Sequence, residues 1–373
     1  MNPFIYGGVV KGEDFINRKK EVKQLETHLS QQKNILLISP RKYGKNSLII
    51  NTLEKLRKNE VLCVYINLNK VTSMHRFLGL YLKEVALEAE DDKYKAAALF
   101  KRLLPKTHVP VEIDLDDLID PGIKTIRGDG IQKATQKVFA LPQKVAEEKQ
   151  KPFVMALNEF QEIKDLNGQS TLESFKSSLK KNHKVSYCFS RTSPDERAEL
   201  KNLCEEYHIQ KVLELEKIPR AQLASYLDQK FKKTGYRLEK GVLDKVLKEA
   251  NDYPYNAQFL CHELWELKNQ EKDILKQDVA LSLSQIIKKQ APFYISIWDS
   301  LTSRQRNVLR ALAQLGGERV FSKEFAKSGG VDPLSTLQTS IRLLRKKNIL
   351  NKIDKRYEFT DAFFRNWIRA EIH

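Results

Sequence analysis

The stretch NILLISPRKYGKN (34–46) decides the fold, because a short apolar run leads into a loop that contains Pro40 and Gly44. After it, SLIINTLEKLRK (47–58) carries apolar residues at helical spacing, and VLCVYINL (61–68) is an apolar run too short for a helix. Strand, loop, helix and strand in this order predict a right-handed βαβ unit and thus a parallel sheet. Further strands of this sheet are expected at 152–160, 185–190 and 210–216.

The loop SPRKYGKN (39–46) matches most of the phosphate-binding pattern G-x-x-x-x-G-K-[ST]. It keeps Gly44 and Lys45, but Ser39 replaces the first glycine and Asn46 replaces the hydroxyl residue that binds magnesium. In such a loop, backbone N–H groups and a helix N-terminus surround phosphates, and the lysine ammonium reaches the terminal ones. The pattern therefore predicts a nucleotide-binding loop; the alternative is a turn that happens to contain Gly-Lys.

A second motif, FVMALNEFQEI (153–163), has the form of a Walker B strand. Glu159 stands where a glutamate polarises the attacking water, but Asn158 stands where an aspartate holds magnesium. Mg²⁺ prefers charged oxygen ligands, and an amide oxygen lacks the negative charge that offsets the loss of hydration. We therefore expect Asn46 and Asn158 to hold magnesium weakly, and phosphoryl transfer to be slow or absent.

Nucleotide binding depends less on these two asparagines, because Lys45 and the loop amides remain. The physical alternative is that Arg41 and Lys42 fill the site electrostatically and that no nucleotide binds.

The composition of the chain limits the classes of partner that it is expected to bind. The chain of 373 residues has a net charge of +17, which fits nucleic acid or an acidic protein surface as well as a solvated lysine-rich surface. No stretch approaches the roughly 18 apolar residues of a membrane span, so no membrane partner is expected. The four cysteines lie far apart, and the start of the chain has no export signal, so a reducing cytoplasm is expected.

The second half of the chain has a helical pattern. We expect an α/β domain at 1–217, a helical lid domain at 218–295 and a winged-helix domain at 296–373, where three helices precede two short strands. Residues 104–130 are expected to form an insertion or β-hairpin. Trp298, Phe363, Phe364 and Trp367 have the spacing of core residues.

At several places the chain resembles the archaeal and bacterial ATPases of the STAND branch of the AAA+ class. The resemblance rests on NPF with FINRKKEVKQL (2–4 and 15–25), PRKYGKNSL (40–48), LPQKVAEEKQKPFVMALNEFQEI (141–163), NDYPYNAQFL (251–260) and YEFTDAFFRNWIR (357–369). It implies a P-loop NTPase α/β fold with a parallel sheet, a helical lid and a C-terminal winged helix.

The resemblance also implies site residues. Glu159 would be the catalytic carboxylate that activates water, and ATP or ADP would be the cofactor. The nucleotide-binding set would be Arg18, Pro40, Arg41, Lys42, Tyr43, Gly44, Lys45, Asn46, Ser47 and Pro254. Departures concentrate in the same pocket, since Ser190-Arg191 replaces the Gly-Ser that ends the sensor strand and Asp252 replaces the lid glycine.

The C-terminal part is the most basic. Residues 301–373 contain 15 Lys and Arg against 7 Asp and Glu, which leaves +8 of the total charge there. In a winged helix, the third helix (334–350) would enter the major groove of DNA with Thr336, Gln338, Thr339 and Arg342. The expected DNA-contacting cations are Arg342, Arg345, Lys346, Lys347, Lys352, Lys355 and Arg356.

Three functions remain open at this stage. The first is a nucleotide-dependent switch with weak or absent hydrolysis. The second is a pseudo-ATPase scaffold for a protein partner, and the third is a winged-helix DNA-binding protein. The altered magnesium positions leave ATPase activity itself undecided, and the sequence does not indicate an oligomeric state.

Overall fold

The computed structural model describes residues 1–16, 18–103, 130–166, 168–181, 183–192, 197–268, 270–331, 333–353 and 355–372. The expected insertion at 104–129 lies outside them. The chain divides into two compact units. The α/β unit contains Arg18–Ser39 and Lys45–Leu215, and the C-terminal unit contains Met1–Asn17, Pro40–Gly44 and Glu216–His373.

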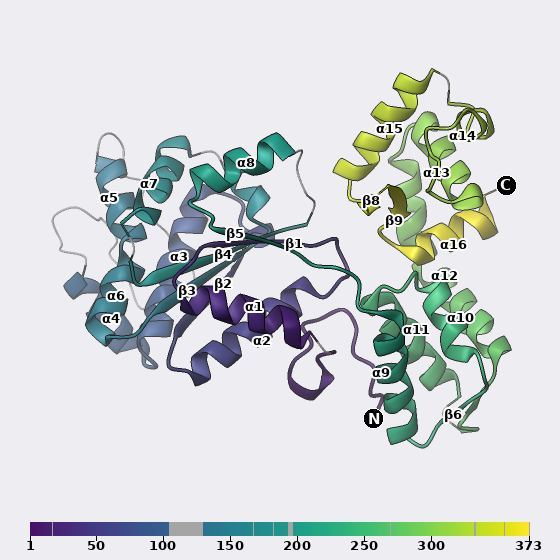
Figure 1. Ribbon diagram of the computed structural model, residues 1–373, viewed down its shortest axis with the longest axis horizontal. Coiled ribbons are helices and arrows are strands. Elements are labelled where there is room, and N and C mark those ends of the chain that lie inside the picture. Colours follow the sequence, from purple (N-terminus) through teal and green to yellow (C-terminus); the bar gives the residue numbers. More distant parts are fainter. Residues whose placement is uncertain are drawn as a thin grey trace. The chain divides into compact units, whose positions relative to one another are not determined.

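The α/β unit is built on a parallel sheet of five strands in the order β2-β3-β4-β1-β5 (Figure 1). The strands are β1 (Ile35–Ile38), β2 (Leu62–Asn67), β3 (Phe153–Asn158), β4 (Val185–Arg191) and β5 (Lys211–Glu214). These are the five strands expected from the apolar runs. Because β4 lies between β3 and β1 and all three strands are parallel, the polar residues that follow them meet at the carboxyl ends of the strands.

Helices cover both faces of this sheet. They are α1 (Lys19–Ser30), α2 (Lys45–Lys58), α3 (Met74–Ala89), α4 (Lys93–Leu103), α5 (Gly130–Phe139), α6 (Leu141–Lys149), α7 (Gln169–Leu179) and α8 (Arg197–Glu206). Figure 1 shows α1 and α2 together on one side of the sheet. On the other side, α3, α6 and α7 contribute Phe77, Val145 and Phe175 to one hydrophobic core that also contains Leu36 of β1.

Short 3-10 helices complete the α/β unit and the chain start. They are η1 (Gly12–Asp14), η2 (Leu68–Lys70) and η3 (Phe160–Asp165).

The C-terminal unit begins with a helical part. It contains α9 (Arg220–Lys233), β6 (Arg237–Leu238), α10 (Val242–Glu249), α11 (Pro254–Leu267), β7 (Asp273–Ile274) and α12 (Lys276–Asp299). The expectation of an entirely helical region was wrong in one detail. Arg237 and Leu238 pair in parallel with Asp273 and Ile274, a pairing too short to leave an alternating pattern in the sequence.

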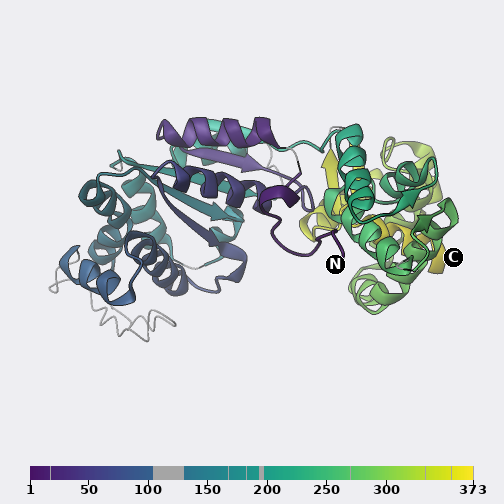
Figure 2. The same ribbon diagram turned by 90° about the horizontal axis from the view of Figure 1, so that it is seen from below.

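A winged helix follows. It contains α13 (Ser303–Leu315), α14 (Lys323–Ser328), α15 (Leu334–Lys346), β8 (Leu350–Ile353), β9 (Arg356–Phe359) and α16 (Ala362–Glu371). Thr302 caps α13 by accepting a hydrogen bond from the backbone N–H of Gln305 at 3.3 Å. In Figure 2 the C-terminus lies at the surface of this unit, at the end of the yellow ribbon.

One hydrophobic core continues through the C-terminal unit. It includes residues of α9 to α12 and of the winged helix, and the expected core aromatics Trp298, Phe363, Phe364 and Trp367 are all buried in it. Among the described residues, no helix is long and apolar enough to cross a membrane.

Candidate nucleotide-binding site

The loop after β1 turns through two residues with positive φ angles. Lys42 and Gly44 both lie in the left-handed region, with φ of 68° and 86°. A Cβ atom at Gly44 would meet no atom within 4 Å, so glycine is required there for its backbone freedom and not for space. Because α2 starts at Lys45, the N-terminus of this helix directly follows the loop.

Lys45 is buried beside two groups of the α/β unit. Its ammonium lies 2.6 Å from Oε1 of Glu159 and donates to the Thr192 hydroxyl at 3.3 Å. The Thr192 hydroxyl donates in turn to Oε2 of Glu159 at 2.5 Å. Each of the three side chains therefore contacts the other two, and the Lys45 ammonium neutralises the Glu159 carboxylate.

Glu159 is held in its ionised form. Burial alone would raise its pKa, but the Lys45 ammonium and hydrogen bonds from Gln161, Lys45 and Thr192 outweigh burial and lower the pKa. Gln161 donates to Oε2 at 2.7 Å. Glu159 also has a φ of 55°, a conformation that is costly for a side chain with a Cβ atom.

Asn158 has both ends of its amide occupied. Its Oδ1 accepts from the Ser190 hydroxyl at 2.7 Å, and its Nδ2 donates to Oδ1 of Asn67 at 3.2 Å. The side chain is almost completely buried and joins the ends of β2, β3 and β4. Asn46 is half-buried in the first turn of α2.

The side-chain oxygens of Asn158 and Glu159 do not fit a magnesium ion well. The amide oxygen of Asn158 already accepts a strong hydrogen bond, and the nearby carboxylate of Glu159 is paired with an ammonium. A hard dication requires several uncommitted oxygen ligands, preferably charged. A phosphate fits better, since Lys45 and the N–H groups at the start of α2 are the donors that phosphates require.

The tip of the loop belongs to the C-terminal unit and is held there by named side chains. Lys42 Nζ lies 2.8 Å from Oδ2 of Asp361 and donates to Oδ1 of Asn256 at 3.2 Å. It also lies 4.9 Å from the ring centre of Tyr255. The ring of Tyr43 is buried and lies 5.3 Å from that of Tyr253.

These contacts bring together three segments singled out in the sequence. Pro254, expected near the nucleotide, is buried at the first turn of α11, between the two tyrosines that contact the loop. Asp361 accepts hydrogen bonds from the N–H groups of Phe363 and Phe364, so it also caps α16. Sequence reasoning did not identify Asn256 or Asp361 as partners of the loop.

The remaining predicted residues occupy varied positions. Arg18, directly before α1, is buried and lies 2.8 Å from Oε1 of Glu21. Arg41 is exposed, and Ser47 is buried in α2. Arg191, at the end of β4, is buried. Thr192 and Gln161, which contact Glu159, were missed, although both lie within two residues of positions that had been named.

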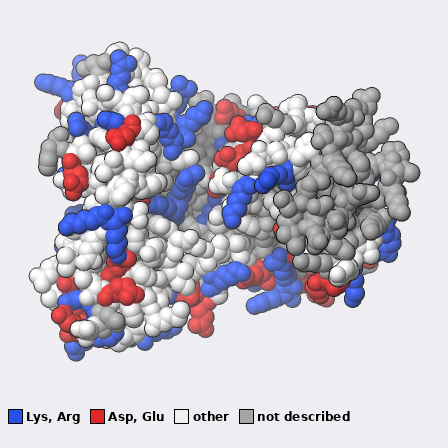
Figure 3. Space-filling view, turned by 180° about the vertical axis from the view of Figure 1, so that it is seen from behind, with Lys and Arg blue, Asp and Glu red and all other residues white. Residues whose placement is uncertain are grey.

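The predicted DNA-contacting cations lie on α15 and on the β8–β9 hairpin. Arg342, Lys346, Lys347, Lys352, Lys355 and Arg356 are exposed, and Arg345 is half-buried. Lys347 donates to the backbone oxygen of Ser300 at 3.0 Å, and Arg356 lies 3.6 Å from Glu358. In Figure 3, Lys and Arg outnumber Asp and Glu on the visible face of the winged helix.

Residues 292–370 match the model of a family described as a probable winged helix domain. A search of curated proteins finds no match to the chain. Among solved structures, the Walker-type ATPase of Pyrococcus abyssi is similar over 98% of this chain and 99% of its own, at 15% identity and a TM-score of 0.66. The chain has the P-loop NTPase fold of the AAA+ class, with a C-terminal winged helix.

Two further structures with this fold come from Aeropyrum pernix. The ORC2 protein, solved as ADPNP–ADP complexes, is similar over 97% of both chains at 13% identity and a TM-score of 0.58. The ORC1 protein, solved in complex with DNA, is similar over 96% of this chain and 94% of its own, at 13% identity and a TM-score of 0.51. The AAA+ fold expected from the resemblance is confirmed; the narrower STAND assignment stays a prediction.

Proposed function

We propose that this chain binds ATP or ADP at the loop 39–47 and works as a nucleotide-dependent switch with slow or absent hydrolysis. The observation that carries the proposal is that two lysines of this loop each form an ion pair. Lys45 is buried beside Glu159 and Thr192, and Lys42, three residues earlier, is paired with Asp361. A phosphate in the loop would compete for both ammonium groups.

The chemistry at Lys45 supports binding. An incoming phosphate offers the buried ammonium a second anion, and the N-terminus of α2 adds partial positive charge at the same place. Glu159 is ionised and positioned by Thr192 and Gln161, so it could accept a proton from water. The neutral asparagines at 46 and 158 leave the developing phosphoryl charge without the usual metal, which supports slow turnover.

The chemistry at Lys42 supports a switch. Its partners Asp361, Asn256 and Tyr255 belong to the winged helix and to α11. Lys42 and Lys45 are in one short loop, so a nucleotide that reorients the loop changes the free energy of the Lys42 contacts. The same fold occurs in the ADPNP–ADP complexes of the Aeropyrum pernix ORC2 protein.

The substitution Asp361→Asn tests the coupling. Asparagine still caps α16, but it removes the carboxylate that competes for Lys42. Since the pair is partly exposed, we expect ADP and ATP affinity to rise about 2- to 5-fold, corresponding to roughly 0.5–1 kcal/mol. The measurement is calorimetric titration of the full chain.

A matched control is Asp273→Asn, which removes the partner of Arg237 in the same unit. It should leave nucleotide affinity unchanged. Equal affinities for the wild type and Asp361→Asn would refute the switch, and absence of nucleotide binding in the wild type would favour the pseudo-ATPase scaffold.

A second candidate function, DNA binding by the winged helix, is supported by the exposed face of α15. Ser335, Thr339, Arg342 and Lys346 are exposed and follow one another at intervals of four, three and four residues, so they share one helix face. The Aeropyrum pernix ORC1 protein, which has this fold, was solved in complex with DNA. A helix face of this kind suits the major groove.

The salt dependence of duplex affinity tests this candidate. Each phosphate contact should contribute about 0.9 to the slope of log affinity against log salt. A steep negative slope supports DNA binding, and a flat slope rules out the electrostatic contacts on which it depends.

A further inference from the structure

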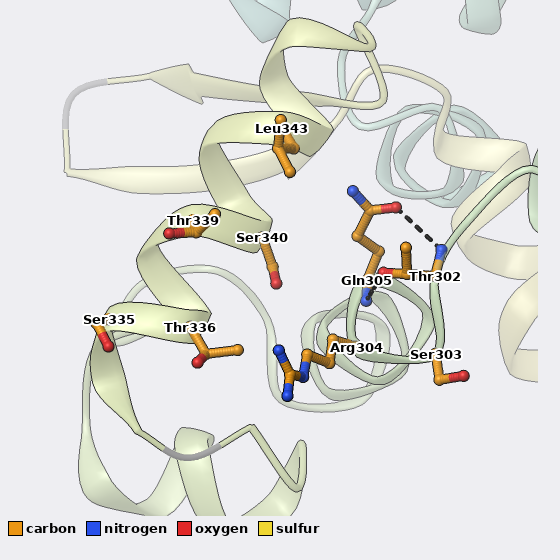
Figure 4. Close-up of a pocket in the computed structure, with 9 residues that line it drawn as sticks. All are labelled: Thr302, Ser303, Arg304, Gln305, Ser335, Thr336, Thr339, Ser340 and Leu343. Carbon is orange, nitrogen blue, oxygen red and sulfur yellow. Dashed lines mark hydrogen bonds between the residues drawn. The ribbon is translucent and has the colours of Figure 1, made fainter.

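A hollow of about 600 Å³ opens in the winged helix between the first turn of α13 and one side of α15. It is separate from the nucleotide loop, and of the residues that line it only Thr336 and Thr339 were among those expected to face DNA. The lining residues are Thr302, Ser303, Arg304, Gln305, Ser335, Thr336, Thr339, Ser340 and Leu343. Figure 4 shows Arg304, Gln305 and Ser340 directed into the space between the two helices.

The lining has a consistent chemistry. Among the lining residues that the structure describes, six carry hydroxyl groups, one carries a guanidinium, one carries an amide, and none carries a carboxylate. Hydroxyl, amide and guanidinium groups all donate hydrogen bonds, and only the guanidinium is charged. The hollow therefore favours a ligand that accepts hydrogen bonds and is negatively charged.

Two buried side chains make this more than an exposed helix end. Gln305 is 3% exposed, and its Oε1 accepts from the N–H of Thr302 at 3.1 Å, which leaves its amide NH₂ for the hollow. Ser340 is 5% exposed and lines the hollow, and no hydrogen bond joins its hydroxyl to another residue that the structure describes. Both donors open onto the hollow, where they are available to an acceptor.

The start of α13 strengthens the preference for an anion. The N-terminus of a helix carries partial positive charge. Thr302 accepts from the N–H of Gln305, while the N–H groups of Ser303 and Arg304 have no acceptor within the helix. Arg304, at the second position of α13, adds a full charge and five donors in a fork that fits phosphate oxygens.

We propose that the hollow holds one backbone phosphate of duplex DNA, with Arg304, Gln305 and Ser340 as its donors. This proposal rests on the second candidate function. Duplex DNA is favoured as the source because α15 also presents Thr339, Arg342 and Lys346 on its exposed face. A phosphate anchored between α13 and α15 would fix the register of that face in the groove. The apolar edge of Leu343 would face the adjoining sugar.

The test compares variants of the full chain in duplex titrations over a salt series. Arg304→Ala should weaken binding about 10-fold and reduce the salt slope by about 1. Ser340→Ala removes a neutral donor, so it should weaken binding about 3-fold with an unchanged slope. Lys288→Ala is the charge-matched control, because Lys288 is an exposed cation on α12 outside the hollow.

The outcomes separate the two proposals. If the wild type binds duplex and Arg304→Ala behaves like Lys288→Ala, the phosphate site is wrong and DNA binding stands. If the wild type does not bind duplex at low salt, both are wrong. Inorganic phosphate alone is the remaining probe. Saturable phosphate binding that Arg304→Ala abolishes, without duplex binding by the wild type, would assign the hollow to a free anion and overturn the proposal.

Discussion

The side chain of Asn158 shows how a single neutral amide changes the chemistry of the sheet edge. In place of a free carboxylate, it presents an oxygen that accepts from Ser190 and a nitrogen that donates to Asn67. The negative charge of the edge is concentrated on Glu159, where Lys45 balances it. Lys45 is therefore the side chain that neutralises Glu159.

Glu159→Gln tests this charge pairing through pH. Because the pKa of Glu159 is lowered in the folded state, its ionised form stabilises the fold above the ordinary pKa of about 4.5. That stabilisation is lost as pH falls through the lower, folded-state value. At pH 7 the variant should be less stable by about 1–3 kcal/mol. Urea unfolding should show the difference shrinking below about pH 4.5, and a constant difference would contradict the pairing.

Restoring the metal-facing residues tests their role. The double substitution Asn46→Ser with Asn158→Asp supplies a hydroxyl and a carboxylate in place of two amides. We expect magnesium to accelerate ATP turnover by the double variant about 10-fold or more, since one charged ligand contributes on the order of 1.5 kcal/mol. Steady-state assays of both single variants serve as controls. Equal magnesium dependence in all four proteins would show that these positions do not limit turnover.

At the scale of elements, apolar runs predicted the strands well. Four of the five strands of the sheet lie within the ranges expected, and β4 extends one residue further, to Arg191, because parallel strands buried on both faces require continuous apolar residues. The final helix α16 was not identified as a helix, although its aromatic residues were identified as core. The strands β6 and β7 are only two residues long, so they leave no alternating pattern in the sequence, although Arg237 and Asp273 also pair through their side chains.

The part of the candidate site that local motifs encode could be predicted from the sequence, and the contacts between distant residues could not. Gly44, Lys45 and Glu159 follow from local motifs, and the structure brings Lys45 and Glu159 together. The partners of Lys42 come from residues more than 200 positions away, and no local pattern encodes such a contact. Thr192 is an isolated threonine after a strand, which sequence alone does not distinguish from others.

Gly44→Ala tests the loop as an element. At a φ of 86° an alanine costs about 1–2 kcal/mol, although its Cβ atom would meet nothing within 4 Å. We expect nucleotide affinity to fall about 5- to 30-fold, because the strained loop leaves its phosphate-binding conformation. Gly235→Ala is the matched control, since Gly235 has a φ of 81° in equally open space. It should lower thermal stability similarly without changing affinity, and equal effects on affinity would contradict a specific role for the loop.

At the scale of the molecule, the two units divide the chain in a way that the sequence did not anticipate. Residues 40–44 group with the C-terminal unit, while Lys45 and the rest of α2 belong to the α/β unit. The three domains expected at 1–217, 218–295 and 296–373 stay a prediction, as does a cytoplasmic location. Charge is also unevenly distributed, with +8 of +17 in residues 301–373.

Within the C-terminal unit, Glu358 joins the winged helix to the helices before it. This buried carboxylate on β9 accepts from Lys217 at 2.9 Å, from Asn251 at 2.9 Å and from the Tyr253 hydroxyl at 3.2 Å. Tyr253 in turn packs on Tyr43 of the loop. The contacts of the loop tip and those of the hairpin thus share one residue, which gives the proposed switch a physical connection.

The most direct test of the central claim is a titration of the full chain with ATP and ADP, with magnesium and with a chelator, beside a turnover assay. We predict micromolar binding whose affinity changes less than about 3-fold on removal of magnesium, because Lys45 and the loop amides supply the contacts. Turnover should be slow or absent. Binding that requires magnesium, accompanied by brisk magnesium-dependent hydrolysis, would contradict the account.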